Sequence, residues 1–123
     1  MSDKSLLTDI FISIEASIDM VLARTKEIKN ATDLVANANG VLLLDSISMR
    51  LQFIGESLKR VEKHDKEFLY SYHEVEWEKI INLRDFISHH YEMLNHQIIF
   101  DICKNHIPQL KKVVTQIIAD VKR

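Results

Sequence analysis

The chain has few residues that interrupt helices or cross-link a fold. Its 123 residues include two glycines, one proline and one cysteine. Scarce glycine and proline, with abundant leucine, isoleucine, lysine and glutamate, favour helices over sheets. The single cysteine, Cys103, excludes an internal disulfide, so nothing points to an oxidising compartment. Cys103 lies in an apolar helical pattern, and we expect a small buried hydrophobe rather than a nucleophile.

Long apolar runs and a secretion signal are also missing. No apolar stretch approaches the roughly 20 residues that a membrane-spanning helix needs. Asp9 and Glu15 interrupt the apolar residues near the N-terminus. We therefore expect a cytoplasmic protein with no membrane partner. The formal net charge of −2 argues against a broadly basic nucleic-acid binder, but it leaves room for a local basic cleft.

Apolar residues at three- and four-residue spacing predict helices throughout the chain. The first main helix is expected over 3–29 and the second over 39–63. The third starts near Val75 and ends or bends between Tyr91 and Asn95, and a short helix precedes it. The fourth begins after an Asn95 N-cap, and Pro108 kinks it or starts a new segment. The length fits a single domain over 1–123, an all-α antiparallel bundle of four main helices plus short extra ones.

The second predicted helix carries an apolar seam at near-heptad spacing. This seam consists of Val41, Leu44, Ile47, Leu51, Ile54, Leu58 and Val61. Gly55 lies inside the same helix, where glycine costs up to ~1 kcal/mol relative to alanine. We expect a neighbouring backbone to approach Gly55 closely, because only such an approach offsets that cost.

The densest polar cluster of the chain covers 84–91. On a helix, Arg84 and Tyr91 are seven residues apart and share nearly one face. His89 lies about 140° around the axis from Arg84. Either the backbone departs from a helix here, or a second copy of the chain completes the site.

These side chains suit RNA cleavage without a metal. A neutral His89 can take a proton from a 2′-hydroxyl or return one to the leaving oxygen. Arg84 can neutralise charge that builds on the phosphoryl oxygens. Asp85 stands one helical turn before His89 and is placed to fix its tautomer. By pattern alone, the same residues also describe an ordinary solvated helix face.

Four segments in order carry a family resemblance. They are Ile54-Gly55-Glu56-Ser57-Leu58-Lys59-Arg60, Trp77-Glu78-Lys79-Ile80, Arg84-x-x-x-x-His89-x-Tyr91 and Ile107-Pro108-Gln109-Leu110. They resemble the I-G-E-A-x-K-R, W-x-x-I, R-x-x-x-x-H-x-Y and L-P-x-L segments of HepT-like HEPN domains. The resemblance runs from about Val41 to Val114. One departure concerns the local loop, because Glu92-Met93-Leu94-Asn95 stands where the family has an aromatic-glycine turn.

The resemblance implies a homodimeric HEPN-like fold with paired motifs facing each other in an interface cleft. It implies a metal-independent ribonuclease toxin of a type VII-like toxin–antitoxin system, needing no cofactor and acting on an RNA such as tRNA or mRNA. The implied antitoxin is a minimal nucleotidyltransferase that in some members transfers AMP to the motif tyrosine. By position, Arg84 and His89 are then the catalytic pair, and Tyr91 is the AMPylation site.

Supporting roles fall to four further residues, Asp85, Ser88, His90 and Glu56. Glu56 either supports the cleft or forms a structural ion pair. His90 is out of register with the signature, so it contacts substrate or solvent. His89 and His96 lie seven residues apart but lack a tight ligand set, so we expect no metal site.

Other functions stay open or are excluded. A non-catalytic HEPN subunit that positions a nucleotidyltransferase or its nucleotide is the main alternative, and a plain dimerisation domain leaves the polar cluster unexplained. No glutamate is followed three residues later by histidine, which excludes a four-helix di-iron site. No glycine-rich phosphate loop is present. A basic run interleaved with acidic residues is expected to be a solvated surface: Lys59, Arg60, Lys63 and Lys66.

Overall fold

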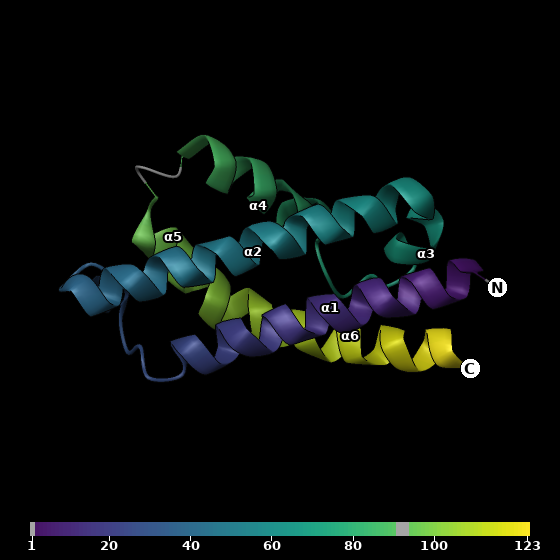
Figure 1. Cartoon of the computed structure of the whole chain (residues 1–123), viewed down its shortest axis with the longest axis horizontal. Coiled ribbons are helices and arrows are strands. Elements are labelled where there is room, and N and C mark those ends of the chain that lie inside the picture. The colour runs from purple at the N-terminus through teal and green to yellow at the C-terminus, as the bar shows by residue number, and fades with distance from the viewer. Residues whose placement is uncertain (1, 91–93) are drawn as a thin grey trace.

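The computed structural model describes residues 2–90 and 94–123, and it consists of helices lying side by side (Figure 1). The four long helices are α1 (Ser2–Thr25), α2 (Ala38–His64), α4 (Trp77–His90) and α6 (Ile107–Lys122). The short elements are η1 (Ala31–Leu34), α3 (Lys66–Tyr70), α5 (His96–Asp101) and the π-helical η3 (Ile102–His106). No strand occurs in these ranges. The prediction of an all-α bundle of four main helices with short extra ones is confirmed.

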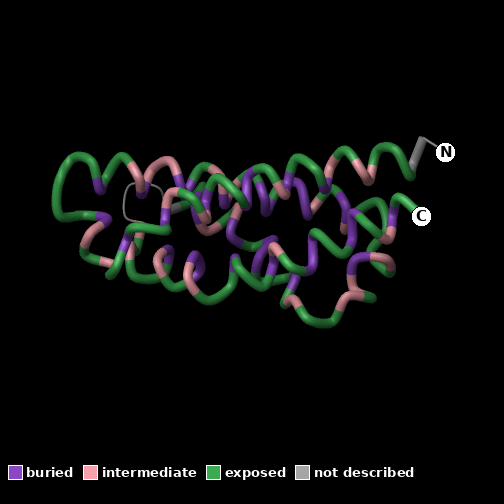
Figure 2. The backbone as a smooth tube through the Cα atoms, turned by 90° about the horizontal axis from the view of Figure 1, so that it is seen from below, coloured by how far each residue is buried: buried purple, intermediate pink, exposed green. Residues whose placement is uncertain are grey.

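Helix α2 occupies the centre of the bundle. It packs against α1 on one side and α4 on the other, while α6 covers α1. Successive long helices run in opposite directions, so the two chain ends lie at the same end of the molecule (Figure 1). Buried residues face inward between the helices, and exposed residues cover the outside (Figure 2). The described part of the chain contains no helix with the length and apolar character needed to cross a bilayer.

The predicted apolar seam of α2 is buried from Leu44 to Val61, but its first member is not. Val41 keeps 42% of its surface exposed, so its assignment to the core is wrong. The first turn of α2 projects past the end of α1 (Figure 1). Gly40 is buried there, and a Cβ at Gly40 would lie 2.1 Å from the carbonyl oxygen of Asp33. Contact with η1 therefore covers Gly40, while Val41, 100° around the helix, faces outward.

Helix α1 ends at Thr25, four residues earlier than predicted. Asn30 has an extended backbone and caps η1, because its side chain accepts a hydrogen bond from the Asp33 N–H at 3.2 Å. The Asp33 carboxylate in return accepts from the backbone N–H groups of Lys29 and Asn30. This capping box competes with continuation of the helix, and it is local chemistry that apolar periodicity does not reveal.

Two predicted features of the second half are confirmed. Asn95 caps α5 by accepting hydrogen bonds from the N–H groups of Gln97 and Ile98. Pro108 starts α6, and the turn before it is π-helical. Proline has no N–H for the carbonyl four residues earlier and its ring clashes with that carbonyl, so a widened turn relieves the conflict.

Cys103 belongs to the core, as expected. Only 1% of its surface is exposed, and burial raises the pKa of its thiol to about 12. The side chain is therefore a packed, protonated thiol. Trp77 is also buried, and its indole N–H donates to the carbonyl of Tyr72 at 2.8 Å, which anchors the start of α4.

The crossing of α2 and α4 occurs at Gly55. A Cβ at this position would lie 3.1 Å from three backbone atoms of α4, namely Arg84 N, Ile80 O and Ile81 O. The close approach predicted from the sequence is therefore confirmed. It places the backbone of Arg84 directly against α2.

Replacing Gly55 by alanine should force α2 and α4 apart. We expect Gly55→Ala to lower the free energy of unfolding by about 1–2 kcal/mol, because overpacking outweighs the gain in helix propensity. Ser46→Ala, on the half-buried side of the same helix, is the control and should change stability by less than about 0.5 kcal/mol. Urea denaturation measures both. Equal or greater stability of Gly55→Ala would show that the crossing is looser than described.

Candidate active site

Two contacts position α4, the helix that carries Arg84 and His89. The hydrogen bond of Trp77 anchors the first turn of α4. Gly55 has no side chain, so the backbone near the middle of α4 can approach α2 closely. The helix then continues without interruption through His90. The candidate site is thus built on a helix packed against the centre of the bundle, the kind of rigid support that catalytic side chains need.

Arg84 lies over α2 with its charge largely unengaged. Its side chain is 33% exposed, and its Nε is buried without a hydrogen-bond partner among the described residues. One terminal nitrogen, Nη2, lies 3.8 Å from the Asp85 carboxylate, a long ion pair. A buried donor without a partner is costly, so an oxygen-rich anion at this position would satisfy it.

His89 is exposed and has one ring nitrogen anchored. Its Nδ1 lies 2.8 Å from the backbone carbonyl oxygen of Asp85. A carbonyl only accepts hydrogen bonds, so Nδ1 carries the proton in this arrangement and Nε2 keeps a lone pair in the neutral ring. This is the tautomer that a general base needs.

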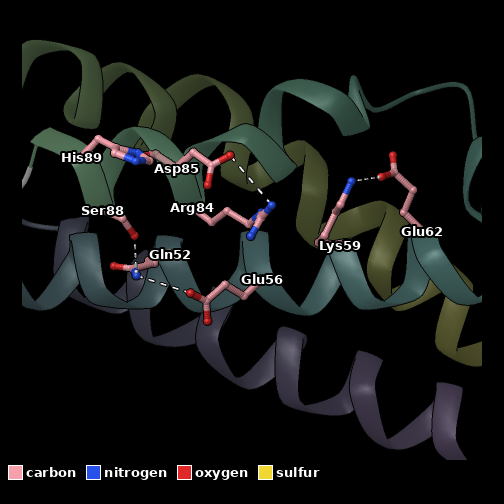
Figure 3. A network of polar contacts seen from close by, with 8 residues as sticks. All are labelled: Gln52, Glu56, Lys59, Glu62, Arg84, Asp85, Ser88 and His89. Atoms are coloured by element: carbon pink, nitrogen blue, oxygen red, sulfur yellow. Dashed lines mark hydrogen bonds and ion pairs between the residues drawn. The ribbon is translucent and has the colours of Figure 1, made fainter.

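The expected role of Asp85 requires a correction. Its carboxylate was expected to orient His89, but its backbone carbonyl does so. The carboxylate instead lies near Arg84, as Figure 3 shows. A histidine ring four residues later on a helix reaches the carbonyl more easily than the outward-pointing side chain.

A polar chain links α2 to the same face of α4. Gln52 donates to Ser88 Oγ at 2.9 Å and to Glu56 Oε1 at 3.4 Å (Figure 3). Ser88 and Glu56 are thereby connected, and no ion pair of Glu56 occurs with any residue in 4–89 or 94–123. Sequence reasoning missed Gln52, although its position one turn before Glu56 on α2 is a usable signal.

Arg84 and His89 are five residues apart on a regular helix and therefore lie about 140° apart around α4. Arg84 lies towards α2, whereas the His89 ring lies along α4 near Asp85 (Figure 3). The backbone is helical over both residues, so the first of the two predicted alternatives, a local departure from the helix, does not apply. Of the other predicted site residues, Tyr91 lies outside the described residues, and so does the side chain of His90.

No group of three or more metal-ligating side chains comes together within the described ranges. His96 begins α5, is half-buried and belongs to no such cluster. The chemistry available at the site is therefore that of an arginine, a histidine and neighbouring hydroxyl, amide and carboxylate groups.

The fold is an all-α domain that carries a half-buried arginine and an exposed histidine on one helix, α4. The chain belongs to the Ribonuclease HepT-like family, whose model matches residues 14–117. The resemblance inferred from the four sequence segments is thus confirmed. No solved structure matches the chain significantly.

Relatives with assigned names support the same family. The protein named "Putative RNase MJ0127" of Methanocaldococcus jannaschii is 36% identical over 72 residues, 58% of this chain and 57% of that protein. "Putative RNase TTE0752" of Caldanaerobacter subterraneus is 35% identical over 72 residues, 58% of this chain and 62% of that protein. The matched segments thus span about three fifths of each relative.

The hydrogen bond of His89 predicts an unusual tautomer. In its neutral form the His89 ring should carry its proton on Nδ1, whereas a histidine without such a bond favours Nε2. Nitrogen-15 NMR of the histidine rings distinguishes the two, with the exposed His73 as the internal comparison. A ring of His89 protonated on Nε2 would contradict the anchoring by Asp85.

Proposed function

We propose that this protein is a metal-independent RNA endonuclease in which His89 and Arg84 perform the chemistry. The observation that carries the proposal is the anchored His89 ring, which leaves Nε2 unprotonated in the neutral form, on the same helix as a partly unsatisfied arginine. Membership of the Ribonuclease HepT-like family supports the same substrate class.

The proposed reaction is an internal transfer followed by departure of the 5′-oxygen. Nε2 of His89 takes the proton of a 2′-hydroxyl, whose oxygen attacks the adjacent phosphorus. The bond from phosphorus to the 5′-oxygen breaks, and an imidazolium returns a proton to that oxygen. Arg84 neutralises the charge on the non-bridging oxygens. The products carry a 2′,3′-cyclic phosphate and a 5′-hydroxyl.

We further propose that the working form is a homodimer. Arg84 and His89 diverge within one chain, so one phosphate reaches both only if a second chain supplies one of them. A two-fold axis near α4 makes this possible, because each surface of such an interface meets its own copy. The site then consists of residues from both subunits.

An exposed apolar stripe on α2 supports this dimer. It consists of Leu42, Met49 and Phe53, which are 65%, 57% and 38% exposed. Their spacing of seven and four residues puts them on one face of the helix, next to Gln52 and Glu56 of the site. Contiguous exposed apolar surface beside a polar site is typical of an interface.

The biological role that we propose is that of a toxin in a type VII-like toxin–antitoxin system, acting in the cytoplasm on an RNA such as tRNA or mRNA. Its antitoxin would be a minimal nucleotidyltransferase that transfers AMP to Tyr91. Tyr91 follows Arg84 by seven residues, so an added phosphodiester would bring negative charge towards Arg84 and repel RNA.

A non-catalytic subunit that positions the nucleotidyltransferase or its nucleotide is the second candidate. The hydrogen bonds of Gln52 favour this second candidate, because they hold Ser88 and Glu56 together in a fixed polar surface. Cleavage assays separate the two functions.

RNA cleavage by the purified protein should survive EDTA and depend on His89. We expect His89→Ala to lower the rate about 10²–10⁴-fold, as for loss of one general acid–base group. His90→Ala is the matched control and should have the smaller effect. Gel assays on total RNA, with mass spectrometry of the ends, measure both. Activity that EDTA abolishes and a divalent ion restores would contradict this mechanism.

The dimer should depend on the α2 stripe. A stable interface buries more than about 1,000 Å² in total, so a charge at its centre is costly. We expect Met49→Asp to give monomers at micromolar concentration in light scattering, while Ile12→Asp on α1 leaves dimers intact. If the native protein is monomeric in this assay, the proposed homodimer is wrong.

AMP transfer should require the hydroxyl of Tyr91. Incubation with a cognate nucleotidyltransferase and ATP should add one AMP per chain and inhibit cleavage. Tyr91→Phe keeps the ring but lacks the acceptor oxygen, so this variant should stay active and unmodified. Mass spectrometry of the intact proteins is the test, and an equal mass gain in Tyr91→Phe would refute the assignment.

A further inference from the structure

The four basic residues at the end of α2 and the start of α3 fall into two pairs with different surroundings. The four residues are Lys59, Arg60, Lys63 and Lys66. Lys59 Nζ lies 2.9 Å from Glu62 Oε1 (Figure 3), and Lys66 Nζ lies 5.5 Å from the centre of the Tyr70 ring. These two cations are therefore engaged within the protein. Arg60 and Lys63 are exposed, and neither pairs with an acidic side chain in the part of the chain that the structure describes.

Arg60 and Lys63 line a groove of about 310 Å³ between the end of α2 and the start of α1. We call it the α1–α2 groove. Its α1 wall is aliphatic and consists of Leu6, Leu7 and Ile10, of which Leu6 is 42% exposed. His64 is the other lining residue, and no carboxylate lines the groove among described residues. The groove thus combines cations on one wall with apolar surface on the other.

Nearby acidic residues are committed elsewhere. The Glu62 carboxylate accepts from Lys59 and from the Tyr70 hydroxyl, and these bonds hold the pKa of Glu62 below its usual range. Asp65 Oδ1 accepts from the Phe68 N–H at 3.1 Å and caps α3. Both carboxylates are thereby held by partners outside the groove, so Arg60 and Lys63 give it a positive potential although the whole chain carries a net charge of −2.

The α1–α2 groove lies further along α2 than the candidate active site. Gly55 marks the level of Arg84 on α2. Arg60 follows five residues later and Lys63 eight, which is about 7.5 Å and 12 Å along the helix axis. An RNA strand with a phosphate at Arg84 that follows the exposed side of α2 would therefore reach both cations within a few nucleotides.

We propose that the α1–α2 groove binds unpaired nucleotides of the RNA substrate next to the scissile phosphate. This inference rests on the proposed function and adds the form of the substrate to it. Arg60 and Lys63 contact backbone phosphates, while the aliphatic wall receives a ribose or the face of an unpaired base. Bases within a duplex are stacked and do not present their faces, so the groove selects single-stranded segments.

Binding in a cleavage-deficient background tests the groove separately from catalysis. The probe is a fluorescent oligouridylate, measured by anisotropy with His89→Ala protein at several salt concentrations. Adding Arg60→Gln and Lys63→Gln should weaken binding about tenfold at 0.15 M salt. The same pair should reduce the slope of log K against log salt by about 1.4, since each single-strand phosphate contact contributes about 0.7. Lys26→Gln with Lys112→Gln removes the same charge elsewhere and is the control.

The outcomes are distinct. Weaker RNA binding in the Arg60 and Lys63 variant, but not in the control variant, supports RNA binding by the groove, even if the native protein cleaves no RNA. An equal loss of RNA affinity in the control variant, or no loss in either variant, overturns the proposal. Unchanged RNA binding with lost binding to phosphatidylserine vesicles would also overturn it, and would assign the groove to an anionic lipid surface. In an active protein, the groove pair should raise KM and leave kcat nearly unchanged.

Discussion

The close contact between Gly55 and the backbone of α4 is the constraint on which the candidate site depends. A side chain larger than hydrogen does not fit there without movement, since a Cβ would lie 3.1 Å from three backbone atoms. This approach brings Arg84 onto α2, close enough for Gln52 of α2 to reach Ser88 of α4. It also leaves the outer face of α2 beside the site, where an apolar stripe is followed by Arg60 and Lys63.

Regular helix geometry explains both what the site offers and what it lacks. Because α4 continues through His90, the carbonyl of Asp85 is in place to anchor His89. The same regularity places Arg84 and His89 about 140° apart around α4, so one chain presents the two proposed catalytic residues separately. In the proposed homodimer a second copy would unite them, and dimerisation would then be a requirement for catalysis.

Sequence periodicity predicted the helices well because each long helix has one buried face. The crossing of α2 and α4 was predicted separately, because close approach of a neighbouring backbone compensates the cost of Gly55 inside a helix. Periodicity failed where local contacts, rather than the buried face of a helix, determine the structure. The capping box of Asn30 and Asp33 ends α1 early, and Val41 lies on a turn that projects beyond its neighbour. At the site, the residue types were predictable, but the choice between the carbonyl and the carboxylate of Asp85 depends on side-chain direction, which spacing does not encode.

The composite site is tested most directly by mixing two inactive variants. Arg84→Ala and His89→Ala chains are refolded together in equal amounts, and native mass spectrometry confirms that mixed dimers form. If each site takes Arg84 from one subunit and His89 from the other, the mixture recovers about a quarter of native RNA cleavage, because half of the dimers are mixed and each has one intact site. Mixed dimers that form but recover no cleavage would contradict the account.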